Sequence, residues 1–275
     1  MKLAASIIAW PADLDAAAFT LLAAGGVGAI EVAPTRVWPQ WKGINSESAR
    51  AFRSAVESSG LSISSLQSVL FQKPELRLFG SDQDRQAMYE HLCRCADLTA
   101  ELGADCMVFG APKNRTRGAL SEENAFAIAV EFFCKAGEYC AQREVCVGFE
   151  ANPEEYGCDF ATDSRTAARL VRAAGSRGFR LHLDTACLHL AGEDPSRAIA
   201  DNIDILRHFH VSEPYLGGFS APSLPHGTIA QTLRRLRYDR WVTVEMRAVD
   251  GPLSALEEAI RFVGDIYGDR EHASA

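Results

Sequence analysis

The chain has 275 residues, of which 47% are hydrophobic and 23% charged, an ordinary globular composition with enough apolar material for a large core. Its formal net charge of −8 would repel phosphate polymers and anionic membrane surfaces, which argues against nucleic acid as a partner. No apolar stretch approaches the roughly 20 residues that a membrane span needs, so we expect no membrane association.

The cysteines and the N-terminus bear on the cellular compartment. Eight cysteines are scattered without a CxxC pair, and several lie in apolar runs such as CMVFG and VCVGF. This distribution favours buried, reduced thiols over disulfides or a zinc knuckle, and it predicts a cytoplasmic protein. The N-terminal MKLAASIIA resembles a signal peptide until Trp10-Pro11-Ala12-Asp13 interrupts it, so we interpret it as a first core strand.

Short apolar or β-branched runs recur along the chain, and each is followed by a loop and then by a segment with helical periodicity. The predicted strands lie near Leu3–Ala9, Ala29–Val32, Ser62–Gln67, Asp105–Phe109, Val145–Glu150, Arg180–Asp184, Ile205–Val211 and Trp241–Met246. The predicted helices span Asp15–Ala24, Ser46–Ser59, Asp82–Leu102, Glu122–Gln142, Asp163–Ala174, Pro195–Ile203, Ile229–Leu236 and Leu253–Ile266.

This strict alternation of strand and helix predicts the fold. It implies parallel strands joined by right-handed crossovers, and eight such units in about 250 residues are the count of a (β/α)8 TIM barrel, an α/β fold. No linker, low-complexity tract or charge block divides the chain, so we expect one domain over residues 1–275. The polar tail from Gly268 onward is predicted to fray.

Polar residues at the C-terminal ends of barrel strands converge on one mouth, where the chemistry of such barrels takes place. The last four predicted strands end in VCVGFE, RLHLD, RHFHV and WVTVE, which supply Glu150, Asp184, His210 and Glu245. Successive members are separated by about one strand–helix unit, so we expect them at a similar height. Three crowded carboxylates would raise one another's pKa unless a cation neutralised them. The sequence therefore predicts one divalent metal ion; three oxygen donors and one imidazole favour Mn, Mg or Co, and Zn also fits.

Two further histidines are predicted to support these ligands. His208 shares a face with His210 if RHFHV is a strand, because strand side chains alternate with period two. His182 has the same parity as Asp184. For both, a buried structural role is the alternative.

Loop residues supply candidate substrate contacts. Glu213 and His226 follow the seventh predicted strand, and their alternatives are a loop cap and a surface turn. Lys113 and Arg115 follow the fourth predicted strand and are placed to hold a phosphate or carboxylate of the substrate; solvated loop charges are the alternative.

The stretches VGFEANPEEYG, LHLDTACLHLAGED, HFHVSEP and WVTVEM resemble motifs of the sugar phosphate isomerase/epimerase family. Its xylose isomerase-like barrels include D-tagatose and D-psicose 3-epimerases, hydroxypyruvate isomerases and inosose dehydratases. The likeness extends over nearly the whole chain. It implies that Glu150, Asp184, His210 and Glu245 bind one divalent metal and that Glu150 and Glu245 double as acid and base. It also implies a homodimer or homotetramer.

The chain departs from the epimerases at three positions. Cys187 stands where they typically have a substrate-binding histidine, Leu216 where they have an arginine, and Tyr156 where they tend to place a glutamate. We predict Asn152, Tyr156 and Cys187 as substrate contacts. The departures bear on the identity of the sugar and leave the predicted metal ligands unchanged.

The expected function is a divalent-metal-dependent isomerase or epimerase of a small sugar, ketose or sugar phosphate. A metal that chelates the carbonyl and hydroxyl oxygens of a ketose would acidify the neighbouring C–H and stabilise an enediolate, while two glutamates transfer protons. An inosose or keto-acid dehydratase on the same site is the alternative. An endonuclease IV-like hydrolase is disfavoured by the net charge of −8 and only seven histidines, and the remaining alternative is a non-catalytic sugar-binding barrel.

Overall fold

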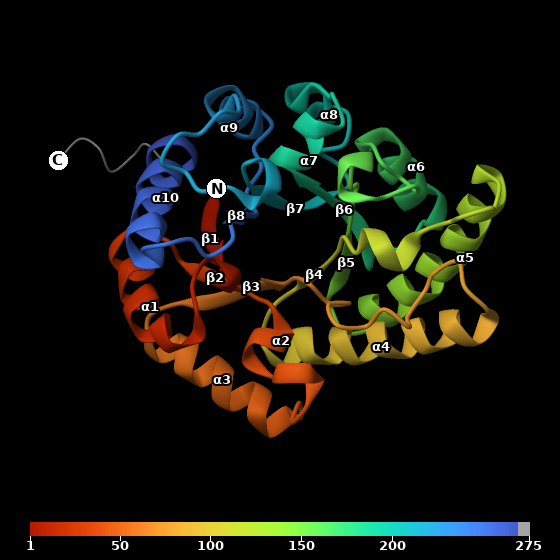
Figure 1. Cartoon of the computed structure of the whole chain (residues 1–275), viewed down its shortest axis with the longest axis horizontal. Helices are drawn as coiled ribbons and strands as arrows, with labels where there is room; N and C mark the ends of the chain where they lie inside the picture. Colours follow the sequence, from red (N-terminus) through yellow and green to blue (C-terminus); the bar gives the residue numbers. More distant parts are fainter. Residues whose placement is uncertain (269–275) are drawn as a thin grey trace.

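Eight parallel strands close into a barrel in which each strand pairs with its neighbours in the sequence and β8 pairs with β1 (Figure 1). The computed structural model describes residues 1–268; the rest of the tail that was predicted to fray lies outside them. The strands are β1 (Lys2–Ser6), β2 (Ala29–Val32), β3 (Ser62–Leu66), β4 (Cys106–Phe109), β5 (Cys146–Glu150), β6 (Phe179–Asp184), β7 (Leu206–Val211) and β8 (Trp241–Val244). The predicted (β/α)8 barrel is confirmed.

The helices surround this barrel (Figure 1). They are α1 (Asp15–Ala24), α2 (Pro34–Val37), α3 (Ser46–Ser58), α4 (Asp82–Glu101), α5 (Glu122–Ala141), α6 (Ser164–Ala174), α7 (Thr185–Leu190), α8 (Pro195–Ala200), α9 (His226–Arg235) and α10 (Pro252–Tyr267). Short 3-10 turns occupy Ile7–Ala9, Ala12–Leu14, Pro39–Trp41, Pro112–Arg115, Glu154–Tyr156 and Pro214–Leu216. None of the helices within residues 1–268 combines the length and apolarity that crossing a membrane requires.

The element boundaries differ from the predicted ones where local capping intervenes. The first strand ends at Ser6 rather than Ala9, because the Ser6 side chain accepts a hydrogen bond from the Ile8 amide and begins a 3-10 turn. Helices α2 and α7 were not predicted. Each has six residues or fewer and directly follows a strand, which leaves too few turns for a periodic pattern to appear.

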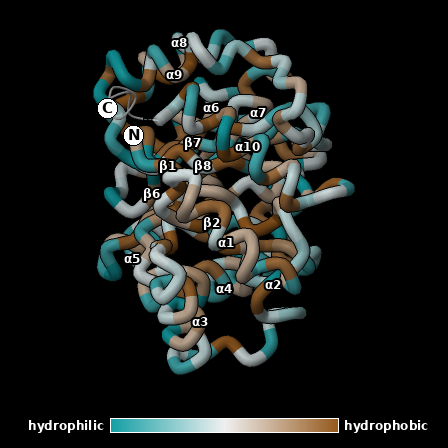
Figure 2. The backbone as a smooth tube through the Cα atoms, turned by 90° about the vertical axis from the view of Figure 1, so that its left-hand side faces the viewer, coloured by the Kyte–Doolittle hydropathy of each residue, from teal (hydrophilic) through white to brown (hydrophobic). Residues whose placement is uncertain are grey.

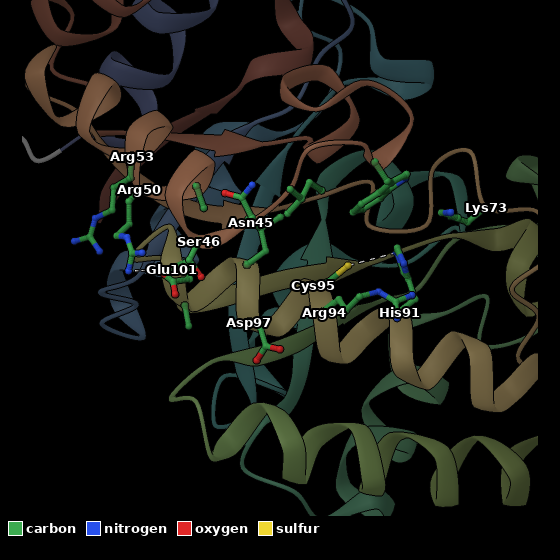
Figure 3. Close-up of a pocket in the computed structure, with 15 residues that line it drawn as sticks. Asn45, Ser46, Arg50, Arg53, Lys73, His91, Arg94, Cys95, Asp97 and Glu101 are labelled. Atoms are coloured by element: carbon green, nitrogen blue, oxygen red, sulfur yellow. Dashed lines mark hydrogen bonds and ion pairs between the residues drawn. The ribbon is translucent and has the colours of Figure 1, made fainter.

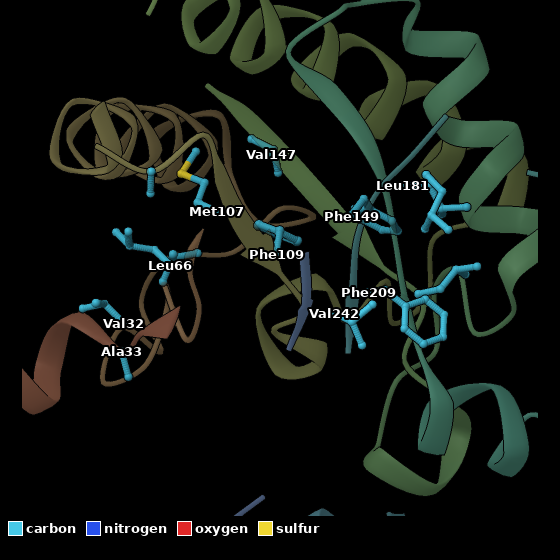
Figure 4. Close-up of a cluster of buried hydrophobic side chains, with 14 of the residues drawn as sticks. Val32, Ala33, Leu66, Met107, Phe109, Val147, Phe149, Leu181, Phe209 and Val242 are labelled. Atoms are coloured by element: carbon cyan, nitrogen blue, oxygen red, sulfur yellow. The ribbon is translucent and has the colours of Figure 1, made fainter. Parts of the chain in front are cut away.

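The main apolar core lies between the barrel and its helices. Phe133 of α5 stacks on Phe179 of β6 with ring centroids 4.5 Å apart, and Phe109 and Phe149 of the neighbouring strands β4 and β5 stack at 5.9 Å (Figure 4 shows these two strand residues). Burying each such side chain stabilises the fold by roughly 1.5–3 kcal/mol. In Figure 2 the hydrophobic stretches follow the inner strands, and hydrophilic residues gather on the outer helices.

The inside of the barrel is polar. Glu31, His182, His208 and Thr243 are all fully or almost fully buried there. The strand register sets the position of these side chains along the barrel axis. Glu150 at the end of β5 pairs with His182, and Asp184 at the end of β6 pairs with His210. A buried polar layer therefore lies directly beneath the strand ends.

The eight cysteines all lie within the described residues, and all are free, as the sequence predicted.

Candidate metal centre

The carboxyl ends of four consecutive strands bring together the side chains predicted as metal ligands. Glu150 ends β5, Asp184 ends β6, His210 is the penultimate residue of β7, and Glu245 directly follows β8. One ligand atom each from Glu150, Asp184 and His210 lie within 4.8 Å of one another. His210 Nδ1 lies 3.2 Å from Glu245 Oε2. The four groups thus meet at the mouth where barrel enzymes carry out their chemistry.

Burial and mutual repulsion oppose the ionised forms of the three carboxylates. Burial, followed by the charges of Glu150 and Glu245, raises the pKa of Asp184 to about 7. Burial also raises the pKa of Glu150 and of Glu245, against the opposing charge of His210. A divalent cation would relieve this repulsion, and oxygen donors with one imidazole suit Mn, Mg, Co or Zn. The residues present therefore fit the predicted ion.

Asp184 is fixed through both of its oxygens. Oδ1 accepts a hydrogen bond of 2.7 Å from the Cys187 amide and so caps α7, and Oδ2 accepts one of 2.5 Å from Ser212 Oγ. Each carboxylate oxygen carries two lone pairs, so a donor position remains on each. Cys187 itself is buried beside this group, and burial raises the pKa of its thiol well above the ordinary value, which keeps it neutral.

Glu150 accepts hydrogen bonds from two residues that were predicted to contact substrate. Asn152 Nδ2 donates to Glu150 Oε2 at 2.7 Å. The Arg115 guanidinium is fully buried over the Phe149 ring; it donates to the Glu150 carbonyl at 2.7 Å and to Asn152 Oδ1 at 3.0 Å. These hydrogen bonds of Asn152 and Arg115 therefore hold Glu150 in position.

Tyr156 and Lys113 lie further from the strand ends. The Tyr156 hydroxyl accepts a hydrogen bond of 3.0 Å from the Tyr215 amide, and burial raises the pKa of Tyr156 to about 12. Lys113 is exposed and lines the cavity at the mouth. Of the predicted substrate contacts, Lys113 is the cation that stays available to a ligand.

Glu213 and His226 are brought together by the structure and engage each other. Glu213 Oε1 lies 2.8 Å from His226 Nε2, and His226 Nδ1 lies 2.8 Å from the Tyr267 hydroxyl. Glu213 Oε2 also accepts hydrogen bonds from the amide and hydroxyl of Ser223. These buried contacts tie the loop after β7 to α9 and α10, so both side chains serve the loop's conformation.

His182 and His208 lie inside the barrel beneath the ligands. The His182 ring is 4.2 Å from the His210 ring between centroids, and its Nε2 is 3.4 Å from Glu150 Oε1. Neither ring nitrogen of His182 has a hydrogen-bond partner among residues 1–268. His208 Nε2 contacts the hydroxyls of Ser65 and Thr243, each at 3.2 Å. Burial lowers the pKa of both histidines, so both are neutral near pH 7.

Two residues of this centre were missing from the predicted set. Glu31, at the penultimate position of β2, is fully buried, with an oxygen 2.9 Å from His210 Nε2. When the Gln67 amide nitrogen faces the carboxylates, it donates to Glu31 at 2.9 Å and to Glu245 at 2.6 Å. The signal for Glu31 was present in the sequence as a single charged residue inside the apolar strand AIEV.

Gly110, directly after β4, leaves the space that the Glu150 carboxylate occupies. A Cβ atom at this position would collide with Glu150 Oε2 and would lie 3.3 Å from Asn152 Oδ1.

Gly110→Ala is therefore expected to displace the Glu150 carboxylate. On the predicted role of Glu150 as acid or base, this should lower kcat by about 100-fold, since a shift near 1 Å in a reacting group has an effect of that size. The displaced atom is the end of a side chain, so the midpoint of thermal unfolding should change little. Gly264→Ala is the matched control, because a Cβ on Gly264 in α10 meets nothing within 4 Å. An unchanged kcat in Gly110→Ala would show that the position of the Glu150 carboxylate does not matter for turnover.

A cavity of about 400 Å³ opens onto the metal centre. It is lined by residues 67–74 after β3, by Val108 and residues 110–114, and by Glu150, His210 and Glu245. Its volume suits a monosaccharide or a somewhat larger ligand.

A larger cavity of about 870 Å³ lies outside the barrel, between α3 and α4 (Figure 3). Its buried His91 is occupied with the Val69 carbonyl at 2.7 Å, and Arg50 pairs with Glu101 at 3.6 Å. Figure 3 shows its charged side chains spread along the two helices and the loop that carries Lys73, rather than meeting at one point. The smaller cavity is therefore the candidate site.

The closed barrel of eight parallel strands, with helices packed around it, defines a TIM barrel. A profile of the family described as "Xylose isomerase-like TIM barrel" matches residues 19–266. The chain belongs to this family, which confirms the resemblance inferred from its motifs.

Solved structures share the fold at low sequence identity. They include D-psicose 3-epimerase from Clostridium cellulolyticum H10 with D-tagatose (TM-score 0.82, 12% identity, 98% of this chain and 100% of that chain). The 3-keto-D-glucoside 4-epimerase YcjR from E. coli is similar (TM-score 0.80, 14% identity, 96% and 99% covered). So is the IolI protein with a bound zinc atom (TM-score 0.76, 14% identity, 97% and 98% covered). No curated protein matches the sequence significantly.

Proposed function

We propose that the protein is an enzyme that isomerises or epimerises a small sugar, ketose or sugar phosphate with the help of one divalent metal ion. The observation that carries this proposal is the meeting of Glu150, Asp184 and His210 donor atoms within 4.8 Å, with Glu245 3.2 Å from His210. The proposal is supported by the family and by solved structures of the same fold that are named as sugar epimerases or hold zinc.

Glu150, Asp184, His210 and Glu245 would hold the ion. When bound, it would polarise the carbonyl and the adjacent hydroxyl of a ketose and so lower the pKa of the intervening C–H. The surrounding side chains keep the donors in place, because Ser212 and the Cys187 amide fix Asp184, and Asn152 fixes Glu150. This preorganisation avoids rearrangement when charge develops on the substrate.

Proton transfer falls to Glu150 and Glu245. They come from β5 and β8, three strands apart around the mouth, so they can face a bound sugar from two sides. Burial raises the pKa of each in the metal-free protein. A bound cation would oppose this shift and favour the ionised carboxylate, which is the form that takes up a proton. One carboxylate removes a proton from carbon and the other returns a proton, and the handedness of the substrate decides which acts first.

The cavity wall indicates how the rest of the substrate is held. Val69, Leu70 and Phe71 present an apolar surface, against which the C–H faces of a sugar can pack. Lys113, which also lines the cavity, can pair with a phosphate if the substrate carries one.

The decisive experiment incubates the metal-loaded protein in deuterated water with a panel of ketoses, ketose phosphates and inososes. Deuterium at the carbon next to the carbonyl, together with an isomeric product of unchanged formula, is the expected result. A product that has lost water would instead establish a dehydratase on the same site. Absence of both labelling and product across the panel would refute the proposal.

Chelation provides a further test. Removing divalent ions with EDTA is expected to abolish turnover and to lower the midpoint of thermal unfolding, because an ion at 100 times its Kd stabilises the folded state by about 2.7 kcal/mol. Adding back Mn²⁺, Co²⁺ or Mg²⁺ should restore both properties, and the ion that does so at the lowest concentration identifies the preferred metal. Full turnover by extensively chelated protein would contradict a metal-dependent reaction.

A further inference from the structure

The carboxylate of Glu31 lies among hydrogen-bond donors at the centre of the barrel. The residue is fully buried, and its Oε2 accepts a hydrogen bond of 2.7 Å from Ser65 Oγ. His208 Nε2 lies 3.1 Å from Oε2, and His210 Nε2 lies 2.9 Å from Oε1. A buried carboxylate is costly unless such donors surround it, so these contacts explain how a charged side chain can stand inside an apolar strand.

These contacts determine where the protons of His210 lie. An ionised carboxylate only accepts hydrogen bonds, so the nitrogen that faces Glu31 must carry a hydrogen. Nδ1 faces Glu245 and by the same argument can carry a hydrogen in the metal-free protein; an ion at the mouth would leave the hydrogen on Nε2 and replace the one on Nδ1. Nδ1 points the other way from Nε2, toward the mouth, where Glu245 Oε2 lies 3.2 Å from it. The two ring nitrogens of His210 therefore face different layers of the site.

We propose that Glu31 is a positioning residue that fixes His210 in the tautomer with hydrogen on Nε2, so that Nδ1 is the atom that binds the metal ion. The inference rests on the metal-dependent function proposed above. Carboxylates commonly orient metal-binding histidines in this way, because they lock the ring and increase its basicity. Here the carboxylate comes from β2, whereas the four proposed ligands come from the consecutive strands β5, β6 and β7 and from the end of β8.

The same assignment decides between two ways of holding an ion. Nitrogen atoms of His182, His208 and His210 also lie within 4.8 Å of one another and could in principle form a second, all-imidazole site. The Nε2 atoms of His208 and His210 are, however, both turned to Glu31. When Nε2 of His208 and Nε2 of His210 both carry hydrogen, neither atom can bind a metal. The three histidines then lie beneath the proposed metal site and bind no ion of their own.

The first test needs no substitution. Long-range ¹H–¹⁵N correlation spectra of the histidine rings are recorded before and after addition of one and then two equivalents of Zn²⁺, which is diamagnetic. We expect the His210 signals to show hydrogen retained on Nε2 and zinc on Nδ1. Zinc on Nε2 of His210, or a second equivalent bound through His208 and His210, would overturn the inference.

The second test measures ion affinity by competition with a chromophoric chelator. Glu31→Gln keeps the shape and one acceptor oxygen but removes the charge, and it should weaken Zn²⁺ and Mn²⁺ binding by about 10–100-fold. Thr243→Val is the matched control, since Thr243 is equally buried and its hydroxyl contacts His208, whereas within residues 1–268 no hydrogen bond joins its side chain to Glu31 or to the His210 ring; it should leave the affinity unchanged.

The outcomes separate the two proposals. Wild-type protein that binds neither ion would overturn the proposed function together with the role of Glu31. Wild-type binding with equal affinity in Glu31→Gln would overturn the role of Glu31 alone. Should Glu31→Gln fail to fold, the nitrogen that binds zinc in the wild-type spectra still decides the inference.

Discussion

Replacing Glu150 or Glu245 with glutamine is expected to lower kcat for the proposed interconversion by about 10²–10⁴-fold, because each carboxylate transfers a proton that the amide cannot take up. Glutamine keeps the size of the side chain and an oxygen that can face an ion. In the wild type, Glu150 Oε2 accepts a hydrogen bond from Asn152, and Glu245 Oε2 lies next to His210 Nδ1. Metal content measured on the purified variants separates a loss of proton transfer from a loss of the ion.

The two variants should differ in a half-reaction. If Glu150 and Glu245 act from opposite sides of the sugar, each variant retains one working base. In deuterated water Glu150→Gln should then exchange the carbon-bound hydrogen of one epimer only, Glu245→Gln should exchange that of the other, and neither should form the inverted product at an appreciable rate. Identical behaviour of the two variants toward both epimers would show that the carboxylates do not divide the reaction in this way.

The fold and the four residues of the mouth could be predicted because both depend on short-range patterns. An apolar run that ends in a carboxylate or histidine marks the end of a strand, and the alternation of strands with helices places four such ends side by side. The stretch RHFHV was informative in the same way, since period-two alternation places His208 directly below His210 in one strand, and the structure has both buried inside the barrel.

The roles of the surrounding residues could not be read from the sequence, because they depend on contacts between distant segments. Arg115 stands in a polar loop where a solvated cation or a phosphate ligand is a natural expectation. The structure buries it fully, because the Glu150 carbonyl lies within its reach. Glu31 lies 179 positions before His210, and no local pattern links the two. Sequence patterns locate strand ends, whereas hydrogen-bond partners across the barrel require the closed sheet.

Asp184→Asn should have opposite effects on the metal-free and metal-loaded protein. In the absence of metal, the pKa of Asp184 is raised to about 7 by burial and by the neighbouring carboxylates, whereas in the unfolded chain it is about 3.9. Between these values the folded state holds a proton that the unfolded state has released. The stability of the metal-free wild type therefore falls as the pH rises through this window, by on the order of 4 kcal/mol at most.

Asparagine removes that penalty. In EDTA at pH 8 the free energy of unfolding of Asp184→Asn should exceed that of the wild type, and the difference should vanish below about pH 4, where the wild-type carboxyl is protonated in both states. With saturating Mn²⁺ the order should reverse, because the variant lacks one of the three carboxylates proposed to neutralise the ion. Urea unfolding at pH 5 and pH 8, each with EDTA and with Mn²⁺, measures four values for each protein. In EDTA the difference between variant and wild type should be much smaller at pH 5 than at pH 8.

Asp194→Asn is the matched control for this experiment. Asp194 caps α8 through the Ser196 amide at 2.9 Å, much as Asp184 caps α7, but it is exposed and was never a candidate ligand. It should respond to neither EDTA nor Mn²⁺ differently from the wild type, since asparagine and aspartate are comparable helix caps. If Asp184→Asn behaved like this control, Asp184 would be a helix cap and nothing more. If Asp184→Asn alone is more stable than the wild type in EDTA and less stable in Mn²⁺, then the Asp184 carboxylate both destabilises the metal-free fold and binds the ion. The metal site would then lower the stability of the metal-free protein at this residue.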